Sequence, residues 1–152
     1  MLIRKIITVS ITSTICSILI GIIQPNAFGE EMNTISDFLF LFVTSQVLYL
    51  MYIFPAVLIY GVLTSIVSDK AAELITSKRK RVELSVSFIL HISFGLVLQL
   101  YSLLAAIPFF ITDRLLRRVD PYLKWQYAIY SLALPGIWWT LCFVVTFMED
   151  IF

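Results

Sequence analysis

The stretch FLFLFVTSQVLYLMYIFPAVLIYGVLTSIVS, residues 38–68, decides the fold class of this chain. It runs for 31 residues without a charged side chain, whereas about 18 consecutive apolar residues are enough to indicate a transmembrane helix. A straight helix of this length would measure about 46 Å, against a hydrocarbon core of about 30 Å. The stretch therefore predicts a membrane helix that tilts, kinks at Pro55 or projects beyond the bilayer.

Three further apolar segments accompany it, at residues 6–23, 84–112 and 127–148. The composition agrees, because 60% of the 152 residues are hydrophobic and 14% are charged, compared with about 45–50% and about 25% in soluble domains. The sequence predicts an all-α integral membrane protein with a single transmembrane domain over residues 1–152. Its expected architecture is a bundle of four transmembrane helices in which two long helices, 38–68 and 84–112, are joined by a basic cytoplasmic loop.

The positions of Lys and Arg predict how the chain is threaded through the membrane. Two precede the first segment, five lie in 69–83 and four lie in 113–126, while 24–37 and the tail after residue 148 have none. Cytoplasmic loops carry the excess of basic residues. Four spans with the N-terminus inside put seven of the eleven basic residues on the cytoplasmic side, so both termini are predicted to be cytoplasmic.

An alternative threading fits the charge rule better. If residues 84–112 formed a re-entrant hairpin, all eleven basic residues would lie inside. Two full spans, however, need about 40 residues, and this segment has 29. Re-entrant backbone must also be buried in protein or line a water-filled cavity, and a four-span protein offers little to bury it. Four full spans are therefore expected, with an imperfect charge bias.

The only histidine of the chain, His91, lies inside the apolar segment 84–112. It belongs to a candidate polar seam whose members recur at helical steps of four and three residues: Ser87, His91, Gly95, Gln99 and Ser102. The structural interpretation is that this seam packs against another helix and that His91 is hydrogen-bonded across it. The functional interpretation is that His91 and Gln99 line a pathway or respond to pH.

Small and hydroxyl residues recur at similar spacings in the other apolar segments. They comprise Ser10, Ser13, Ser17 and Gly21 in the first, Gly61, Ser65 and Ser68 in the second, and Gly136 and Thr140 in the last. Such spacings let membrane helices approach closely and hydrogen-bond. They predict packing seams between helices.

A run of four basic residues, Lys78, Arg79, Lys80 and Arg81, lies in the segment 69–83. One interpretation is a topology signal that keeps this loop in the cytoplasm. The other is a set of contacts with anionic lipid, each worth about 1 kcal/mol near the membrane surface. The two interpretations are compatible, and the first is sufficient by itself.

The residues that catalysis or metal binding would need are not arranged for either. Nucleophilic catalysis needs a base near the nucleophile, and His91 has no such partner nearby in the sequence. Cys16 and Cys142 both lie inside apolar segments, as small packing residues do. No metal-ligand spacing is found, and a net charge of +1 gives no field that would attract nucleic acid. The sequence predicts a protein without enzymatic activity, cofactor or nucleic-acid partner.

The stretch YIFPAVLIYGVLTSIVSD, residues 52–69, is followed by the basic segment and then by FILHISFG, residues 88–95. These two stretches, and the layout of four apolar segments, resemble a family of small uncharacterised multi-span membrane proteins from Bacillus-type bacteria. The resemblance implies a multi-pass protein of the bacterial plasma membrane. It implies no activity and supplies no catalytic residues.

A role as an interaction protein is preferred, because it requires no chemical groups beyond those that the sequence contains. The expectation is an accessory, immunity or regulatory protein whose partners are the lipid bilayer and a second copy or another membrane protein. The alternative is a transporter or channel subunit for small solutes or drugs that works as an oligomer. Small multidrug exporters carry a glutamate in the first span, and residues 6–23 contain none.

Overall fold

The structure is a computed structural model that describes residues 2–76, 80–97, 100–119 and 123–149. Its regular elements in these ranges are α1 (Leu2–Ile23), α2 (Ile35–Ala56), the π-helical segment η1 (Val57–Gly61), α3 (Val62–Thr76), α4 (Lys80–Val97), α5 (Leu100–Val119) and α6 (Trp125–Glu149). Within the described ranges, three stretches are long and apolar enough to cross a membrane: Leu2–Ile23, Ile35–Ile75 and Trp125–Met148. The prediction of an all-α protein with membrane-length apolar helices is confirmed at this level.

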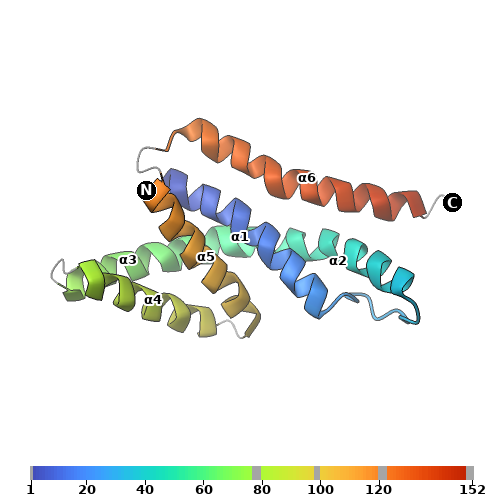
Figure 1. Ribbon diagram of the computed structural model, residues 1–152, viewed down its shortest axis with the longest axis horizontal. Coiled ribbons are helices and arrows are strands. Elements are labelled where there is room, and N and C mark those ends of the chain that lie inside the picture. Colours follow the sequence, from blue (N-terminus) through green and yellow to red (C-terminus); the bar gives the residue numbers. More distant parts are fainter. Residues whose placement is uncertain (1, 77–79, 98–99, 120–122, 150–152) are drawn as a thin grey trace.

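The helix predicted over residues 38–68 extends beyond its apolar stretch at both ends, from Ile35 to Thr76. Helices α2, η1 and α3 follow one another directly and form the longest element of the molecule (Figure 1). A capping box sets its first residue, because the Thr34 side chain accepts a hydrogen bond from Asp37 N at 3.1 Å. In return, the Asp37 carboxylate accepts one from Thr34 N at 2.8 Å. These two bonds satisfy amide groups that the first turn leaves free.

The π-helical segment η1 begins two residues after Pro55, which lies inside α2. Proline has no amide hydrogen, so the helix loses one of its regular hydrogen bonds there. A π-helical turn adjusts the register of the bonds that follow and often marks a functional site. In this chain η1 brings Val57 and Gly61 to face α1 and α5.

The prediction of a basic loop over 69–83 is wrong for most of its length. Residues 69–76 continue α3, and α4 begins at Lys80. The local sequence Ala71-Ala72-Glu73-Leu74 explains the extension, since these residues have high helix propensity. The two helices pack side by side as an antiparallel pair at one end of the molecule (Figure 1).

The prediction of one helix over 84–112 is also wrong. The chain forms α4 up to Val97 and α5 from Leu100, and the two helices pack against each other. A single helix would hold Gly95 and Ala106 about 16 Å apart. Instead, a β-carbon added at Gly95 would lie 2.9 Å from Cβ of Ala106. Glycine at this position allows the two helices to approach so closely.

Protein surrounds the α4–α5 pair on two sides, which the sequence argument against a hairpin did not foresee. Helix α5 packs along α1, and α4 packs along α3. Phe109 of α5 forms a hydrophobic core with Val9, Val57 and Val62, and it is 1% exposed. Helix α1 therefore forms one wall beside the α4–α5 pair, and the long α2–η1–α3 element forms the second wall. A bundle of four separate spans would not provide this second wall.

Helix α1 lies at the centre of the fold. Ser10, Ser13 and Ser17, which form its predicted seam, are fully buried. Their hydroxyl groups donate to carbonyl oxygens of α1 itself, for example Ser13 Oγ to Val9 O at 2.7 Å, so burial leaves these donors satisfied. The prediction that this seam packs against other helices is confirmed.

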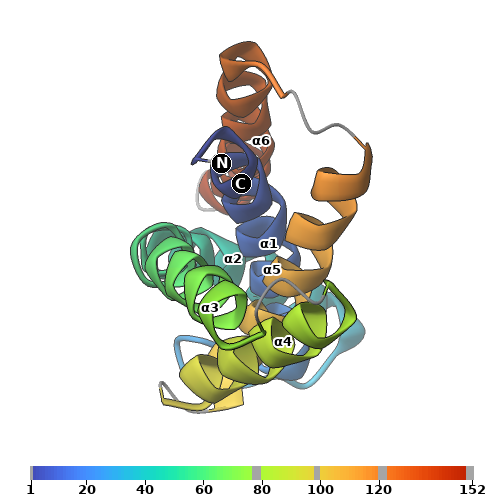
Figure 2. The ribbon, with the colours of Figure 1, turned by 90° about the vertical axis from the view of Figure 1, so that its left-hand side faces the viewer.

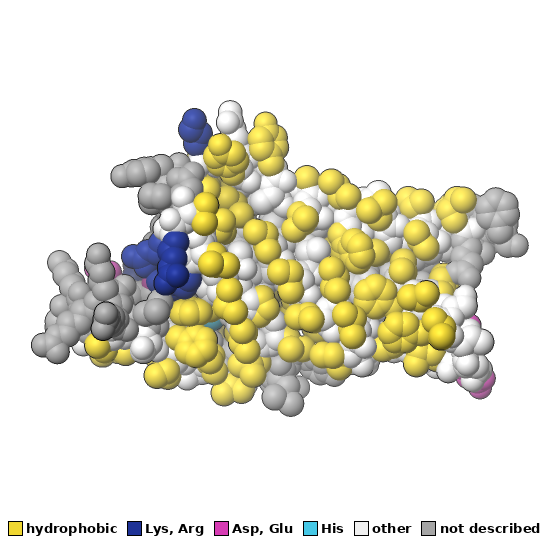
Figure 3. All heavy atoms as spheres, viewed as in Figure 1, with side chains coloured by type: hydrophobic (Ala, Val, Ile, Leu, Met, Phe, Trp, Pro, Cys, Tyr) yellow, Lys and Arg dark blue, Asp and Glu magenta, His cyan; other side chains and the backbone are white. Residues whose placement is uncertain are grey.

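Helix α6 packs on α1 and α2 through polar contacts. Trp139 Nε1 donates to Val47 O at 3.2 Å, and Ser131 Oγ donates to Ser10 Oγ at 3.2 Å. The start of α1 and the end of α6 lie at opposite ends of the molecule (Figure 1). Figure 3 shows Lys and Arg side chains gathered toward the end where α1 begins, with a broad hydrophobic belt beyond them.

Candidate functional site

Five charged residues from three parts of the chain meet near the start of α1. We call them the charge cluster: Arg4, Lys5, Asp69, Asp113 and Arg114. Figure 2 looks at this end of the molecule and shows α1 between α3 and α5. Each residue lies at or just beyond the end of an apolar stretch, so the fold brings the ends of three stretches together.

Lys5 is the centre of the charge cluster, and its side chain is fully buried. Its ammonium nitrogen lies 3.1 Å from Asp69 Oδ2 and 3.0 Å from Asp113 Oδ2, and it also donates to Ser65 Oγ. An ammonium group has three donors, and all three have a partner here. The burial of this lysine is therefore compensated by a complete set of acceptors.

An arginine completes the surroundings of each carboxylate. Arg4 Nε lies 2.8 Å from Asp113 Oδ1, and an Arg114 guanidinium nitrogen lies 2.7 Å from Asp69 Oδ1. Ser87 of α4 donates to the same Asp69 oxygen at 2.9 Å and accepts a hydrogen bond from Arg114. The charge cluster thus ties α1 to α3 and α5, and Ser87 adds α4 to the network.

The charge cluster contains three cations and two carboxylates, so it carries one excess positive charge. Buried ion pairs add little net stability, because desolvation opposes their attraction, but removing one partner leaves a costly unpaired charge. The cluster consequently acts as a position-specific clamp: it favours the one arrangement in which all five groups meet.

His91 lies one turn beyond Ser87 on α4 and is 4% exposed. Its ring stacks on Phe109, with the ring centroids 5.5 Å apart, and it also contacts Phe110. It forms no hydrogen bond within the described part of the chain, so the expected bond across a seam is not found. His91 also lines a space between the helices.

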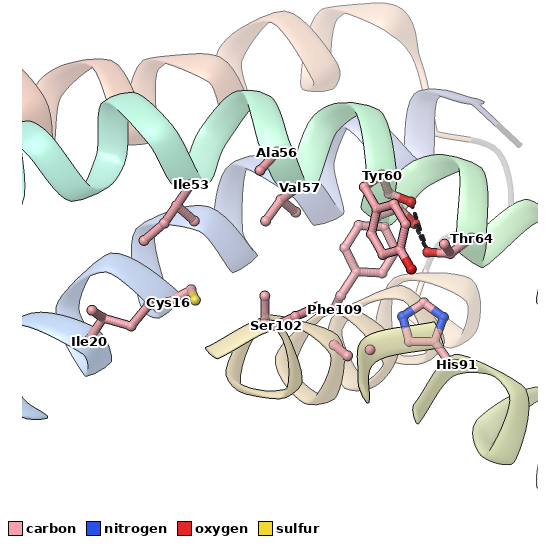
Figure 4. A pocket seen from close by; sticks show the side chains of 14 residues that line it. Cys16, Ile20, Ile53, Ala56, Val57, Tyr60, Thr64, His91, Ser102 and Phe109 are labelled. Carbon is pink, nitrogen blue, oxygen red and sulfur yellow. Dashed lines mark hydrogen bonds between the residues drawn. The ribbon is translucent and has the colours of Figure 1, made fainter. Parts of the chain in front are cut away.

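That space is a partly open cavity of about 240 Å³. Its walls come from α1, α2, η1, α3, α4 and α5, and they are mostly apolar. The polar groups near His91 are the side chains of Tyr60 and Thr64 (Figure 4). Cys16 and Ile20 lie at the other end of the same view. The cavity therefore has a polar end and an apolar end.

The structure separates the predicted polar seam into two environments. Ser87 belongs to the network of the charge cluster. His91 and Gly95 line the cavity from α4, and Ser102 lines it from α5. Gln99 lies outside the described residues, so the prediction made for it stays a prediction.

The predicted lipid contacts also remain untested. Lys78 and Arg79 lie outside the described residues. The backbone of Lys80 and Arg81 starts α4, but their side chains are not part of the description. Anionic-lipid binding by this run therefore stays a prediction.

Sequence reasoning missed the charge cluster, although a signal for it was present. Arg4 and Lys5 precede the first apolar segment, whereas Asp69 and Asp113 follow the second and third. Opposite charges at the ends of neighbouring apolar segments indicate that those ends meet. A four-span threading puts Asp113 on the opposite side of the membrane from Lys5, and this hid the relation.

The two stretches with which the chain resembles small membrane proteins of Bacillus-type bacteria, 52–69 and 88–95, contain Asp69 and His91 of this site. No protein family matches the chain, and no curated protein or solved structure is significantly similar to it. The resemblance therefore stays a prediction, and the functional argument rests on the geometry of the site itself.

Proposed function

We propose that the chain is a multi-pass protein of the bacterial plasma membrane with three spans and one re-entrant hairpin. The spans are α1, the α2–η1–α3 element and α6, and the hairpin is α4–α5. This threading is supported by the charge cluster, in which the start of α1 meets Asp69 of α3 and Asp113 of α5. Both ends of the hairpin then lie on the side where α1 begins.

The charge rule supports the same threading. With the start of α1 in the cytoplasm, all eleven Lys and Arg residues fall on the cytoplasmic side. The opposite side receives the linker 24–34, which contains Glu30 and Glu31 and no basic residue. This proposal moves the C-terminus from the expected cytoplasmic side to the outside. With this threading no Lys or Arg lies outside, whereas four spans would leave four of them there.

In this membrane we propose a non-enzymatic accessory, immunity or regulatory role that depends on association with a second copy of the chain. The observation that carries the proposal is an uncovered face of α6. A β-carbon added at Gly136 would have no neighbour within 4 Å, and Thr140, one turn further on, is exposed. Glycine and threonine four residues apart let two membrane helices pack closely.

A second copy fits this face for reasons of symmetry and shape. In a twofold dimer within one membrane, the same patch of α6 meets itself, so Gly136 of each copy would offer room to the other. Beside Gly136, a shallow groove between α2 and α6 is lined by residues that include Met51, Pro55 and Leu132. Such a groove can receive the larger side chains of the facing α6.

Co-purification of two differently tagged copies tests the proposal. Membranes are extracted with a polymer that retains native lipid, and one tag is used to recover the other. Gly136→Leu should reduce recovery at least fivefold, although the folded monomer has room for the new side chain. Val145→Leu is the matched control, because Val145 is exposed and lies on the opposite side of α6. Recovery that is absent in the parent, or unchanged in Gly136→Leu, would refute association through this face.

The alternative of a small-solute transporter or channel subunit has one supporting observation. The proposed re-entrant hairpin borders a cavity, and re-entrant segments commonly line aqueous pathways. Ser102→Cys places a thiol on the cavity wall. In a variant lacking Cys16 and Cys142, reaction of this thiol with a water-soluble, membrane-impermeant reagent favours a pathway. A thiol protected from both sides of the membrane rules against transport.

A further inference from the structure

The cavity beside His91 has features that neither the charge cluster nor the α6 face explains. It is bounded by the π-helical segment η1 on one side and by the α4–α5 hairpin on the other. We propose that it binds a small, neutral, mostly apolar molecule with one hydrogen-bonding oxygen, a hydroxyl or a carbonyl, which His91 recognises. This inference goes beyond the proposed association and does not depend on it.

His91 supplies the recognition element. The residue is 4% exposed and lines the cavity, and no hydrogen bond of its ring nitrogens is found among the described residues. A neutral imidazole offers one donor and one acceptor. Stacking on Phe109 holds the ring, and Figure 4 shows it facing the cavity. A ligand hydroxyl or carbonyl in the cavity could pair with one of these ring nitrogens.

Neighbouring groups at the same end are already engaged but can still accept hydrogen bonds. Tyr60 donates its hydroxyl to Phe94 O at 2.8 Å, which holds it beside α4. Thr64 donates its hydroxyl to Tyr60 O at 2.8 Å. Because each oxygen keeps an acceptor lone pair, a ligand hydroxyl has more than one acceptor within this end of the cavity.

The remaining walls and the volume define the rest of the ligand. Ile53, Val57 and Ala105 form apolar walls, which favour a hydrocarbon body. An engineered apolar cavity of about 150 Å³ holds benzene, so 240 Å³ has room for one ring with alkyl substituents. Charge on the ligand is disfavoured, because the cavity walls are mostly apolar and offer a charged group little to replace its water. In the proposed threading the cavity lies within the bilayer, so a ligand of this kind can arrive from the lipid phase.

The solitary histidine makes a direct test feasible. Protein labelled with ¹⁵N-histidine and placed in lipid nanodiscs gives imidazole signals from His91 alone. Thymol, an alkylated phenol, should shift these signals in a saturable manner. Its hydrocarbon counterpart p-cymene, which lacks only the hydroxyl, should bind about tenfold more weakly, the effect expected for one hydrogen bond.

Two results with the parent protein would overturn the proposal. One is an unchanged His91 signal at a thymol concentration that saturates the membrane phase. The other is an equal shift with thymol and p-cymene, since His91 would then not recognise the oxygen. Ser102→Phe, which adds a ring to the cavity wall, should abolish the saturable shift, and its persistence would place the bound thymol elsewhere. The titration of the parent protein is decisive even if this variant does not fold.

Discussion

Replacing Lys5 by methionine removes the one member of the charge cluster that contacts both of its carboxylates. Methionine keeps a similar length and an apolar stem, so the substitution deletes the charge with little change in volume. The ammonium nitrogen lies 3.1 Å and 3.0 Å from the two carboxylate groups. At an effective dielectric constant of about 20, each of these contacts contributes about 5 kcal/mol of Coulomb attraction before desolvation is subtracted.

The net loss is smaller than the Coulomb sum. Removing one partner of a buried ion pair costs about 3–5 kcal/mol. Asp69 and Asp113 each retain an arginine, at 2.7 Å and 2.8 Å, so neither carboxylate becomes unpaired. We therefore expect Lys5→Met to lower the free energy of unfolding by about 3 kcal/mol, at the lower end of that range.

The assay is unfolding of the purified protein in mixed detergent micelles, followed by helix content. Lys70→Met is the matched control, because Lys70 is next to Asp69 in the sequence but is exposed, and its loss should change stability by less than about 0.5 kcal/mol. Adding Asp113→Asn to Lys5→Met should recover part of the loss, with a coupling energy of about 1–3 kcal/mol. Equal stability of the two lysine variants would refute the buried position of Lys5.

Two further predictions concern close approaches between helices. In a variant without Cys16 and Cys142, Gly95→Cys and Ala106→Cys should form a disulfide on mild oxidation, because their β-carbons would be neighbours. A shift in gel mobility reports the disulfide. Absence of the shift would favour one continuous helix. Gly21→Leu should destabilise the protein by about 1–3 kcal/mol, since a β-carbon there would meet Gln46 and Phe42. Gln46→Ala should relieve part of that loss in thermal unfolding, and an additive loss would mean that the two residues do not touch.

The apolar segments were predictable because the length and hydropathy of a segment are enough to indicate a membrane helix. The predicted ranges 6–23 and 127–148 lie within α1 and α6, and 38–68 lies within the α2–α3 element. The ends were less predictable. Capping by Thr34 starts α2 three residues early, and good helix formers after Asp69 carry α3 past the end of its apolar stretch.

The hairpin was not predictable from segment 84–112 taken by itself. Its hydropathy is compatible with one helix, and Gly95 is compatible with either arrangement. The arrangement is decided by tertiary contacts of Phe109 with α1 and α3 and of Asp113 with Lys5. For the same reason, the seam reasoning found His91 and Ser102 but missed Lys5 and Asp113, which share a site only after the hairpin has folded back.

Whether residues 113–126 face the cytoplasm is decided by one labelling experiment in intact cells. Arg118→Cys and Glu149→Cys are made separately in a variant lacking Cys16 and Cys142 and are treated with a membrane-impermeant maleimide. Three spans with a re-entrant hairpin predict that position 149 reacts in intact cells, whereas position 118 reacts only after the membrane is permeabilised. Reaction at 118 together with protection at 149 would instead establish four spans and contradict the hairpin threading.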